Sequence, residues 1–486
     1  MNGAPLTLFN SFSRSLEPFA PAQGDVARVY SCGPTVYNYA HLGNLRAYVF
    51  TDTLRRTLAF KGLGVRHVIN ITDVGHLTSD ADAGEDKMEL AAAGLGKDIW
   101  EVAAFYTAAF KRNLADLNVL DPTLWSVATD HIADMIAFAG KIAPDHCYEI
   151  DSGLYFDVTT VPDYGRLARA VSEEGESRID PVTGKRNAAD FAIWRRSPQG
   201  EQRQMEWDSP WGRGAPGWHL ECSVMSLKYL GPEPFDIHTG GIDHREIHHP
   251  NEIAQNQAYC GCTDATPGFT GARFWMHNNF LVDRQGKMSK SAGGFTTLQS
   301  LIDAGVHPLA YRLLCLSAHY RSELEFSTEA VLAALTRLKR LVLTVERLPL
   351  ASVDSGADAP AAIRLYLDRL DAGLSDDLNT PVALTALDDL LADKSLSPED
   401  RRAGLERFDA ALGLNLLRIT RPELRLRPAT ASPTEAEIEA SLDERQQARA
   451  ARDFARSDAI RDSLFAQGVE VMDGDPLRWD WRIALD

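Results

Sequence analysis

A strand, a turn and a helix follow one another within residues 26–62, and this succession constrains the possible folds more than any other stretch. Residues 26–31 alternate as a buried strand does, and an apolar stripe at helical spacing runs from Ala47 to just before Gly62. Between them lies the segment Cys-Gly-Pro-Thr-Val-Tyr-Asn-Tyr-Ala-His-Leu-Gly-Asn, residues 32–44. In an open parallel sheet such a turn lies at the carboxyl ends of the strands, where ligands bind, so we expect an α/β fold with a binding site here.

The turn combines a thiol with groups suited to phosphate. Gly43 lets a ligand approach the backbone closely, and the free amide groups of a first helical turn attract phosphate. His41 and Asn44 are three residues apart and share one face at the helix start. Taken alone, the segment fits a nucleotide site about as well as a structural turn in which Cys32 belongs to the core.

A second segment, Lys-Met-Ser-Lys-Ser at residues 287–291, carries two ammonium groups and two hydroxyl groups. Alone it is compatible with a solvated charged loop. Together the two segments resemble the signature sequences of class I aminoacyl-tRNA synthetases, and Cys32 narrows the resemblance to the cysteinyl-tRNA synthetase family, over nearly the whole chain. The chain departs from the family at Asn44, where the first signature usually ends in His, and at Pro250, where Glu is common.

The remaining patterns indicate where further elements lie. Strands are expected at residues 65–71 and 235–238, with the sheet resuming near 218–222, a hairpin at 148–158 and short strands at 469–472 and 479–482. Helices are expected at 98–119, from His248 onward, and at 307–319, 329–348, 361–374, 381–392, 398–412 and twice within 434–467. An acidic loop is expected at 79–87 and linkers at 351–359 and 427–433. Trp479 and Trp481 suit either stacking on bases or a minimal core.

The resemblance implies an architecture for these elements. It consists of a Rossmann-type parallel sheet split by an insertion, then an α-helical bundle that binds tRNA, then a small C-terminal α+β unit that reads the anticodon. The expected domains are the first half of the catalytic domain (1–118), the connective insertion (119–210), the second half with the metal ligands (211–268), the stem-contact region with the second signature (269–328), the bundle (329–426) and the C-terminal unit (427–486).

Four residues are candidate metal ligands: Cys32, Cys222, His248 and Glu252. Thiolate and imidazole groups suit zinc, and a carboxylate oxygen is an acceptable further ligand. His248 and Glu252 share a helix face, yet the spacing from Cys32 matches no zinc-finger pattern, so from spacing alone a structural interpretation stays open. The resemblance implies that these four hold one Zn²⁺ per subunit, which selects the substrate thiol over the hydroxyl group of serine.

The resemblance also implies roles for the other signature residues. His41, Asn44, Lys287 and Lys290 are expected to act in catalysis, and ATP is expected to contact His41, Gly43, Asn44, Gly240 and Lys290. Gly33, Thr72, Trp218 and Asp243 match positions that line the amino-acid pocket, although Trp218 could equally be core packing. The implied substrates are L-cysteine, ATP with Mg²⁺, and tRNA(Cys).

The composition of the chain limits the classes of protein to which it can belong. A formal net charge of −18 argues against general nucleic-acid affinity, so any RNA-binding surface must be a local basic patch. No run of 18 apolar residues is present, the first residues lack the features of a secretory signal, and six Cys in 486 residues do not suggest a disulfide framework. We therefore expect a cytoplasmic monomer without membrane contact.

Two other functions stay open at this stage. One is a tRNA-independent cysteine ligase that passes cysteine to an amino sugar, and the other is a non-catalytic paralogue of a synthetase. The first alternative is disfavoured because roughly 195 residues follow Ser291, which leaves room for tRNA-binding units. The second is disfavoured by the retained His41, Lys290 and four ligand candidates.

Overall fold

A computed structural model describes residues 3–483 except 75–86, 169–181, 199, 201–202, 232, 262–268, 284–285, 288–296 and 350–359. The expected acidic loop, most of the second signature and the 351–359 linker therefore lie outside the described residues. Within the described part of the chain, no helix is both long and apolar enough to cross a membrane.

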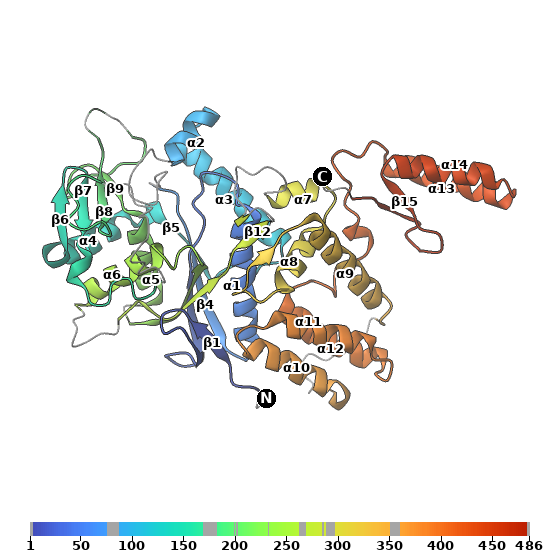
Figure 1. The fold of residues 1–486 in the computed structure, drawn as a ribbon, viewed down its shortest axis with the longest axis horizontal. Coiled ribbons are helices and arrows are strands. Elements are labelled where there is room, and N and C mark those ends of the chain that lie inside the picture. Colours follow the sequence, from blue (N-terminus) through green and yellow to red (C-terminus); the bar gives the residue numbers. More distant parts are fainter. Residues whose placement is uncertain are drawn as a thin grey trace.

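A five-stranded parallel sheet forms the centre of the molecule (Figure 1). The strand order is β11 (Ala272–Asn278), β10 (Phe235–Gly241), β3 (Val26–Ser31), β4 (Gly64–Ile71) and β5 (Leu124–Val127). β3 is thus the middle strand, and it pairs in register with both β10 and β4. Because all strands are parallel, their carboxyl ends meet at one edge, as the sequence predicts.

Helices cover both faces of this sheet (Figure 1). On one face lies α1 (Leu42–Phe60), whose Phe50, Leu54 and Leu58 form a core cluster with Val29. The other face carries α5 (Trp218–Leu230) and α6 (His248–Cys260). The predicted strand at residues 218–222 is therefore wrong: this segment is the first turn of α5, which starts directly after the short strand β9 (Gly214–Pro216).

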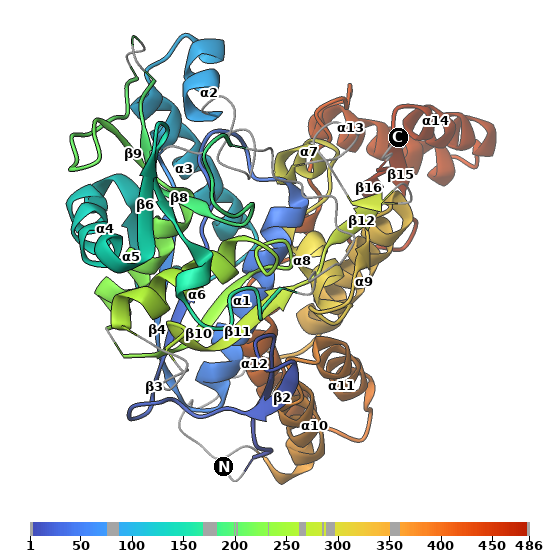
Figure 2. The same cartoon turned by 60° about the vertical axis from the view of Figure 1, so that its left-hand side comes forward.

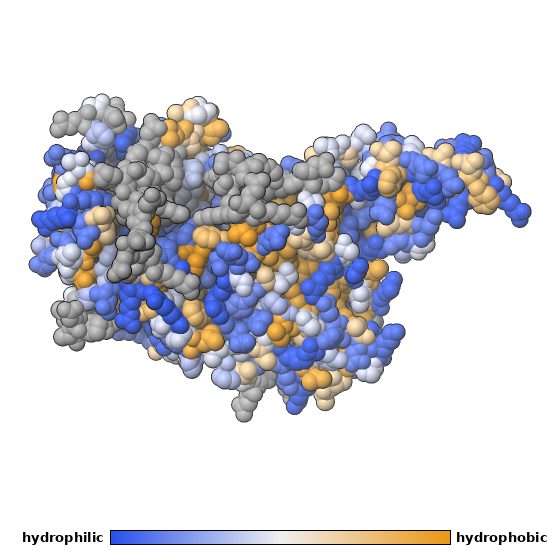
Figure 3. Space-filling model, viewed as in Figure 1, coloured by the Kyte–Doolittle hydropathy of each residue, from blue (hydrophilic) through white to orange (hydrophobic). Residues whose placement is uncertain are grey.

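Further elements lie between β4 and β10 in the sequence, in addition to β5 and α5. They are α2 (Lys87–Leu95), α3 (Ile99–Asp116), α4 (Ile132–His146) and an antiparallel sheet of β6 (Cys147–Ile150), β7 (Gly153–Phe156), β8 (Phe191–Arg196) and β9. The predicted hairpin is confirmed as β6 and β7. Apolar residues gather on the surface over α2 (Figure 3), which packs on α3.

Smaller elements complete the chain around the sheet. At the N-terminus β1 (Thr7–Asn10) pairs with β2 (Ser15–Pro18), and short 3₁₀ helices lie at Ala128–His131, Val158–Thr160, Ala361–Ile363 and Pro422–Leu424. After the sheet, β12 (Leu281–Asp283) pairs with β13 (Gly286–Lys287) and β14 (Leu324–Glu325), flanked by α7 (Leu298–Asp303) and α8 (Pro308–Leu316). The bundle helices are α9 (Thr328–Glu346), α10 (Arg364–Ser375), α11 (Thr380–Ala392) and α12 (Pro398–Leu412).

The last unit projects from the body of the molecule (Figures 1 and 2). It consists of α13 (Glu435–Ala450), α14 (Phe454–Ala466), β15 (Val469–Val471) and β16 (Trp479–Trp481). Trp479 and Trp481 are buried with Ile438, Leu442 and Leu464. Of the two alternatives for these tryptophans, the structure supports a small core.

Candidate active site and metal centre

A cavity of about 300 Å³ opens at the carboxyl ends of the sheet strands. It is lined by segments that are far apart in the sequence, namely the turn after β3, the end of β10 and the residues before β12. The predicted site residues along its wall are Cys32, Gly33, His41, Gly43, Asn44, Thr72, Trp218, Cys222, Gly240, Asp243 and His248. Of the other candidates, Lys287 is placed by its backbone in β13, whereas Lys290 lies outside the described residues.

The N-terminus of α1 forms one wall of the cavity. His41 is the N-cap, and its Nδ1 accepts a hydrogen bond from the Asn44 amide at 3.1 Å. In return the Asn44 Oδ1 accepts from the His41 amide at 3.3 Å. This reciprocal capping box fixes both side chains at a helix end where free amide groups favour an anion. Asn44 therefore has a structural role in addition to any role with phosphate.

The start of α1 forms hydrogen bonds with residues that precede and follow the second signature in the sequence. The backbone of His41 pairs with that of Thr297, which lies just beyond residues 288–296. The buried Arg46 donates to the carbonyl group of Asn279 at 2.9 Å and to that of Phe280, directly before β12. Residues that precede and follow the second signature in the sequence therefore contact the start of α1 beside the cavity, although more than two hundred residues separate the two signatures.

The four predicted metal ligands come together at the base of the cavity. One ligand atom from each of Cys32, Cys222, His248 and Glu252 lies within 4.8 Å of the others. Ligands around a tetrahedral zinc, bound at about 2.0–2.3 Å, are about 3.5 Å apart, so small side-chain shifts would close such a site. The number and types of donor atoms and their spacing therefore fit Zn²⁺.

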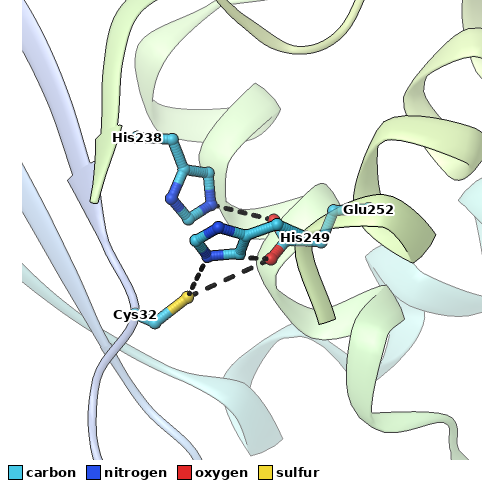
Figure 4. A group of neighbouring side chains, drawn as sticks. All are labelled: Cys32, His238, His249 and Glu252. Atoms are coloured by element: carbon cyan, nitrogen blue, oxygen red, sulfur yellow. Dashed lines mark hydrogen bonds and ion pairs between the residues drawn. The ribbon is translucent and has the colours of Figure 1, made fainter. Parts of the chain in front are cut away.

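A second group of four shares two of these residues. Cys32 and Glu252 also lie within 4.8 Å of His238 and His249 (Figure 4). The Cys32 Sγ is 3.3 Å from the His249 Nε2, and the His238 Nε2 is 2.9 Å from the Glu252 Oε2. The two groups differ in access, because Cys222 and His248 line the cavity whereas His238 and His249 do not. Only the first group could present a bound metal to a ligand in the cavity.

Protonation differs among the four residues of the first group. A hydrogen bond from Cys32 lowers the pKa of Cys222 to about 6, against the effect of burial. Burial raises the pKa of Glu252, but the charges of His238 and His248 outweigh it and bring the pKa to about 2. Thiolate and carboxylate are the forms in which Cys222 and Glu252 bind metal. Burial raises the pKa of Cys32, whereas at His248 burial is outweighed by the charge of Glu252 and contacts with Cys222, which raise the pKa to about 10. Cys32 and His248 would therefore each release a proton when a metal binds.

The wall of the cavity around Gly33, Thr72 and Gly240 is closely packed. The Gly33 amide donates to the Asn70 Oδ1 at 2.7 Å, and a Cβ at Gly33 would lie 1.5 Å from the Asn70 carbonyl oxygen. The Thr72 hydroxyl donates to the Glu221 Oε2 at 2.8 Å. A Cβ at Gly240 would lie 2.7 Å from the His249 ring. Two glycines thus keep the backbone close to neighbouring groups where larger residues would intrude.

The ring of Trp218 packs directly against one of the four candidate metal ligands. Its ring stacks on the His248 ring at a centroid distance of 4.3 Å. It lines the cavity at the start of α5 and is not part of the buried core. Between the two interpretations that the sequence leaves open, the structure favours a pocket wall that also orients an imidazole group.

Sequence analysis misses the histidines behind the four candidates. His219 Nδ1 is 2.9 Å from His248 Nδ1, and His277 Nε2 is 2.8 Å from His249 Nδ1. A second imidazole partner fixes the orientation of each ring. The only available signal is weak: His249 precedes Glu252 by three residues and so shares its helix face. His238 and His277 lie on the neighbouring strands β10 and β11, and His219 lies on α5, so no local pattern reveals that they converge.

Comparisons with known proteins agree with this geometry. The family described as "tRNA synthetases class I (C) catalytic domain" matches residues 18–336. The chain is 63% identical over 483 residues to the cysteine–tRNA ligase of Novosphingobium aromaticivorans, which covers 99% of this chain and 98% of that protein. It is 56% identical over 511 residues to the cysteine–tRNA ligase of Zymomonas mobilis, with 99% and 98% covered.

Solved structures show the same fold at low identity. A ternary complex titled "Agrobacterium radiobacter K84 agnB2 LeuRS-tRNA-LeuAMS" superposes with a TM-score of 0.55 at 14% identity, over 83% of this chain and 84% of that chain. A Mycobacterium tuberculosis methionyl-tRNA synthetase in complex with methionyl-adenylate superposes with a TM-score of 0.51 at 15% identity, over 82% and 92%.

Proposed function

The chain belongs to the cysteine–tRNA ligases, a family of class I aminoacyl-tRNA synthetases, and we propose that it activates L-cysteine with ATP and transfers it to tRNA(Cys). The observation that carries this proposal is the single cavity. It brings together the amide groups of a helix N-terminus and a group of two thiols, an imidazole and a carboxylate. A phosphate and a substrate thiol can therefore be bound within reach of each other.

In the first step, a carboxylate oxygen of cysteine attacks the α-phosphorus of ATP. The bond from that phosphorus to pyrophosphate breaks, and pyrophosphate leaves with the electron pair. His41, Asn44 and the first-turn amides of α1 hold the phosphates, with Gly43 and Gly240 allowing close approach. Lys287 and Lys290 neutralise the charge of the leaving pyrophosphate, and Mg²⁺ accompanies ATP.

In the second step, a hydroxyl oxygen of the terminal ribose of tRNA attacks the carbonyl carbon of the adenylate. AMP leaves with the electron pair of the broken C–O bond, and the hydroxyl proton passes to a phosphate oxygen of AMP. Gly33, Thr72, Trp218 and Asp243 hold the amino acid in position during both steps, because orientation supplies much of the rate.

Selection of cysteine needs more than pocket shape. An apolar pocket separates near-isosteres such as cysteine and serine by only about 1–3 kcal/mol. Zn²⁺ bound by Cys32, Cys222, His248 and Glu252 would take the substrate thiolate as a further ligand, for which a serine hydroxyl group is a poor substitute. His219 and Trp218 hold the His248 ring in its orientation.

We assign the bundle and the C-terminal unit to tRNA binding and anticodon recognition. The free thiols of Cys32 and Cys222 suit a reducing cytoplasm, where we place the enzyme as a monomer. The test is to incubate the protein with radioactive cysteine, ATP and bulk tRNA and to measure acid-precipitable cysteine. Charging of tRNA supports the proposal. Pyrophosphate exchange without charging would indicate an amino-sugar ligase instead, and neither activity would indicate a non-catalytic paralogue.

A further inference from the structure

Three aromatic rings meet at the rim of the cavity. The ring centroid of Tyr39 lies 5.1 Å from that of Tyr106 and 6.0 Å from that of Phe105. Phe105 and Tyr106 are 5.2 Å apart, and all three pairs meet edge to face. Tyr39 belongs to the turn before α1 and the other two to α3, so the cluster joins the first signature to α3.

Two of these rings are exposed, although α3, the helix that carries Phe105, has a core face of its own. Phe105 is 42% exposed and Tyr39 is 44% exposed, whereas Val102 and Phe110 of α3 are buried. The periodicity of α3 predicts Phe105 among its apolar positions, and the structure places it on the surface. Packing of the core therefore does not account for an aromatic side chain at either position.

The cluster of Tyr39, Phe105 and Tyr106 extends from the wall of the cavity to the surface outside it. Tyr39 and Tyr106 line the cavity, while Phe105 lies beyond it. Tyr39 is also only two residues before His41. A flat group bound against Phe105 would therefore lie just outside the reaction chamber, in contact with its entrance.

A positive charge accompanies the rings. The Lys97 Nζ lies 5.3 Å from the centroid of Phe105, and the Lys97 side chain is exposed. Exposed aromatic rings beside a lysine are typical of surfaces that bind single-stranded nucleic acid, where bases stack on the rings and the cation contacts phosphate. The rings and Lys97 thus form a local aromatic patch with one cation, and the exposed Asp98 and Glu101 follow Lys97 at the start of α3.

The position favours the RNA end over ATP as the ligand. In the proposed function the phosphates of ATP lie at the N-terminus of α1, inside the cavity whose wall includes Asn279 and Phe280. Phe105 is outside the cavity, where a nucleotide bound inside cannot reach it. The terminal ribose of tRNA, in contrast, has to enter from outside after the adenylate has formed.

We propose that Tyr39 and Phe105 form a stacking platform for the unpaired 3′ end of the RNA substrate. The platform rests on the proposed function, because it presumes that an RNA end is the acceptor. Tyr106 supports the two exposed rings from beneath, and Lys97 contacts a phosphate of the same strand. The platform holds the strand at the entrance while its terminal ribose reaches the adenylate.

The test compares two reactions of the full-length enzyme carrying Phe105→Ala or Tyr39→Ala. The value of kcat/KM for tRNA in the charging reaction should fall about 5- to 100-fold, the equivalent of losing one stacked base. Pyrophosphate exchange with cysteine and ATP needs no RNA and should be unchanged in Phe105→Ala. Phe105→Tyr should restore charging, whereas Phe105→Leu should not, because leucine keeps the bulk and loses the ring face.

Trp100→Ala is the matched control. Trp100 is an exposed aromatic residue of the same helix, five positions before Phe105, and belongs to none of the three ring contacts. Its charging kinetics should equal those of the unaltered protein. Equal losses in Trp100→Ala and Phe105→Ala would overturn the platform, because they would indicate a general effect on α3.

A shortened RNA locates the contact. The unaltered enzyme should bind the tRNA(Cys) transcript that lacks its last two nucleotides with lower affinity than it binds the full-length transcript. In Phe105→Ala this difference should disappear. If the variant loses affinity equally for both RNAs, or if only its KM for ATP rises, the platform is refuted. Absence of pyrophosphate exchange in the unaltered protein would instead refute the proposed function.

Discussion

Asp52 of α1 and Arg312 of α8 form a fully buried ion pair, with 2.5 Å between the Asp52 Oδ2 and the Arg312 Nη2. Arg56 also donates to the Asp52 Oδ2, at 2.7 Å, and the Leu120 amide donates to the Oδ1 at 2.9 Å. Arg312 in turn donates to the Leu412 carbonyl group at the end of α12. One carboxylate thus joins the helix that begins at the cavity to the bundle.

Removal of this carboxylate should strongly destabilise the protein. We expect Asp52→Ala to lower the free energy of unfolding by about 3–5 kcal/mol, because two guanidinium groups lose their buried partner. Urea unfolding followed by circular dichroism measures this. The double variant Asp52→Ala/Arg312→Met should recover part of the loss, since it removes one of the unpaired charges as well. If Arg312→Met lowers the stability of Asp52→Ala by as much as it lowers that of the unaltered protein, Asp52 and Arg312 are not coupled.

The ion pair of Asp52 with Arg312 makes the stability of the fold depend on pH in a direction that can be predicted. Arg312 and Arg56 lower the pKa of Asp52 below its usual value, although burial acts in the opposite direction. A carboxyl group whose pKa is lower in the folded state stabilises the fold above its unfolded pKa, near 3.9, and this contribution is lost as the pH falls through the folded value. The stability difference between the unaltered protein and Asp52→Asn should therefore be largest near neutral pH and shrink below about pH 4.

Two single substitutions distinguish the two possible ligand groups. Cys222 belongs only to the group that lines the cavity, and His249 only to the group behind it. If the first group holds the metal, Cys222→Ser should lose most of the bound zinc and with it cysteine activation, while His249→Gln keeps the zinc. Elemental analysis of the purified proteins measures zinc per chain independently of activity. Zinc that is retained in Cys222→Ser and lost in His249→Gln would assign the metal to the second group.

Local patterns predict the elements of this protein better than they predict its site. The strand at 26–31 and the helix at 398–412 have the predicted bounds, because alternation, caps and spacing are encoded in neighbouring residues. Residues 218–222 were misassigned because α5 starts after Gly217 without a side-chain cap, so no helix-start signal is present. The meeting of Cys32 with Cys222 depends on the packing of α5 against β3, which no local pattern encodes and only the family resemblance implies.

Gly33 lies so close to the Asn70 carbonyl group that adding a single methyl group at this position should disturb the turn. In Gly33→Ala the new Cβ would overlap the Asn70 carbonyl oxygen of β4, so the turn that carries Cys32 must move. We expect a loss of about 1–3 kcal/mol in stability and a sharp fall in cysteine activation. The matched control is Gly140→Ala within α4, where nothing lies near the added Cβ. That variant should be as stable as the unaltered protein or up to about 1 kcal/mol more stable.

The capping box at the start of α1 allows the structural role of Asn44 to be separated from its role with phosphate. Asn44→Asp retains an oxygen that can accept from the His41 amide, so the free energy of unfolding should change by less than about 0.5 kcal/mol. The new negative charge would face the phosphates of ATP at the helix start. We therefore expect kcat/KM for ATP in pyrophosphate exchange to fall at least about tenfold.

Asn44→Ala provides the comparison for this last prediction. It removes the side-chain half of the capping box at Asn44 and adds no charge, so it should cost up to about 1 kcal/mol in stability. Its kcat/KM for ATP should fall less than that of Asn44→Asp, because the amide groups of α1 still face the cavity. If Asn44→Asp exchanges pyrophosphate as fast as the unaltered enzyme, the phosphates of ATP do not lie at the N-terminus of α1, and Asn44 serves the helix alone.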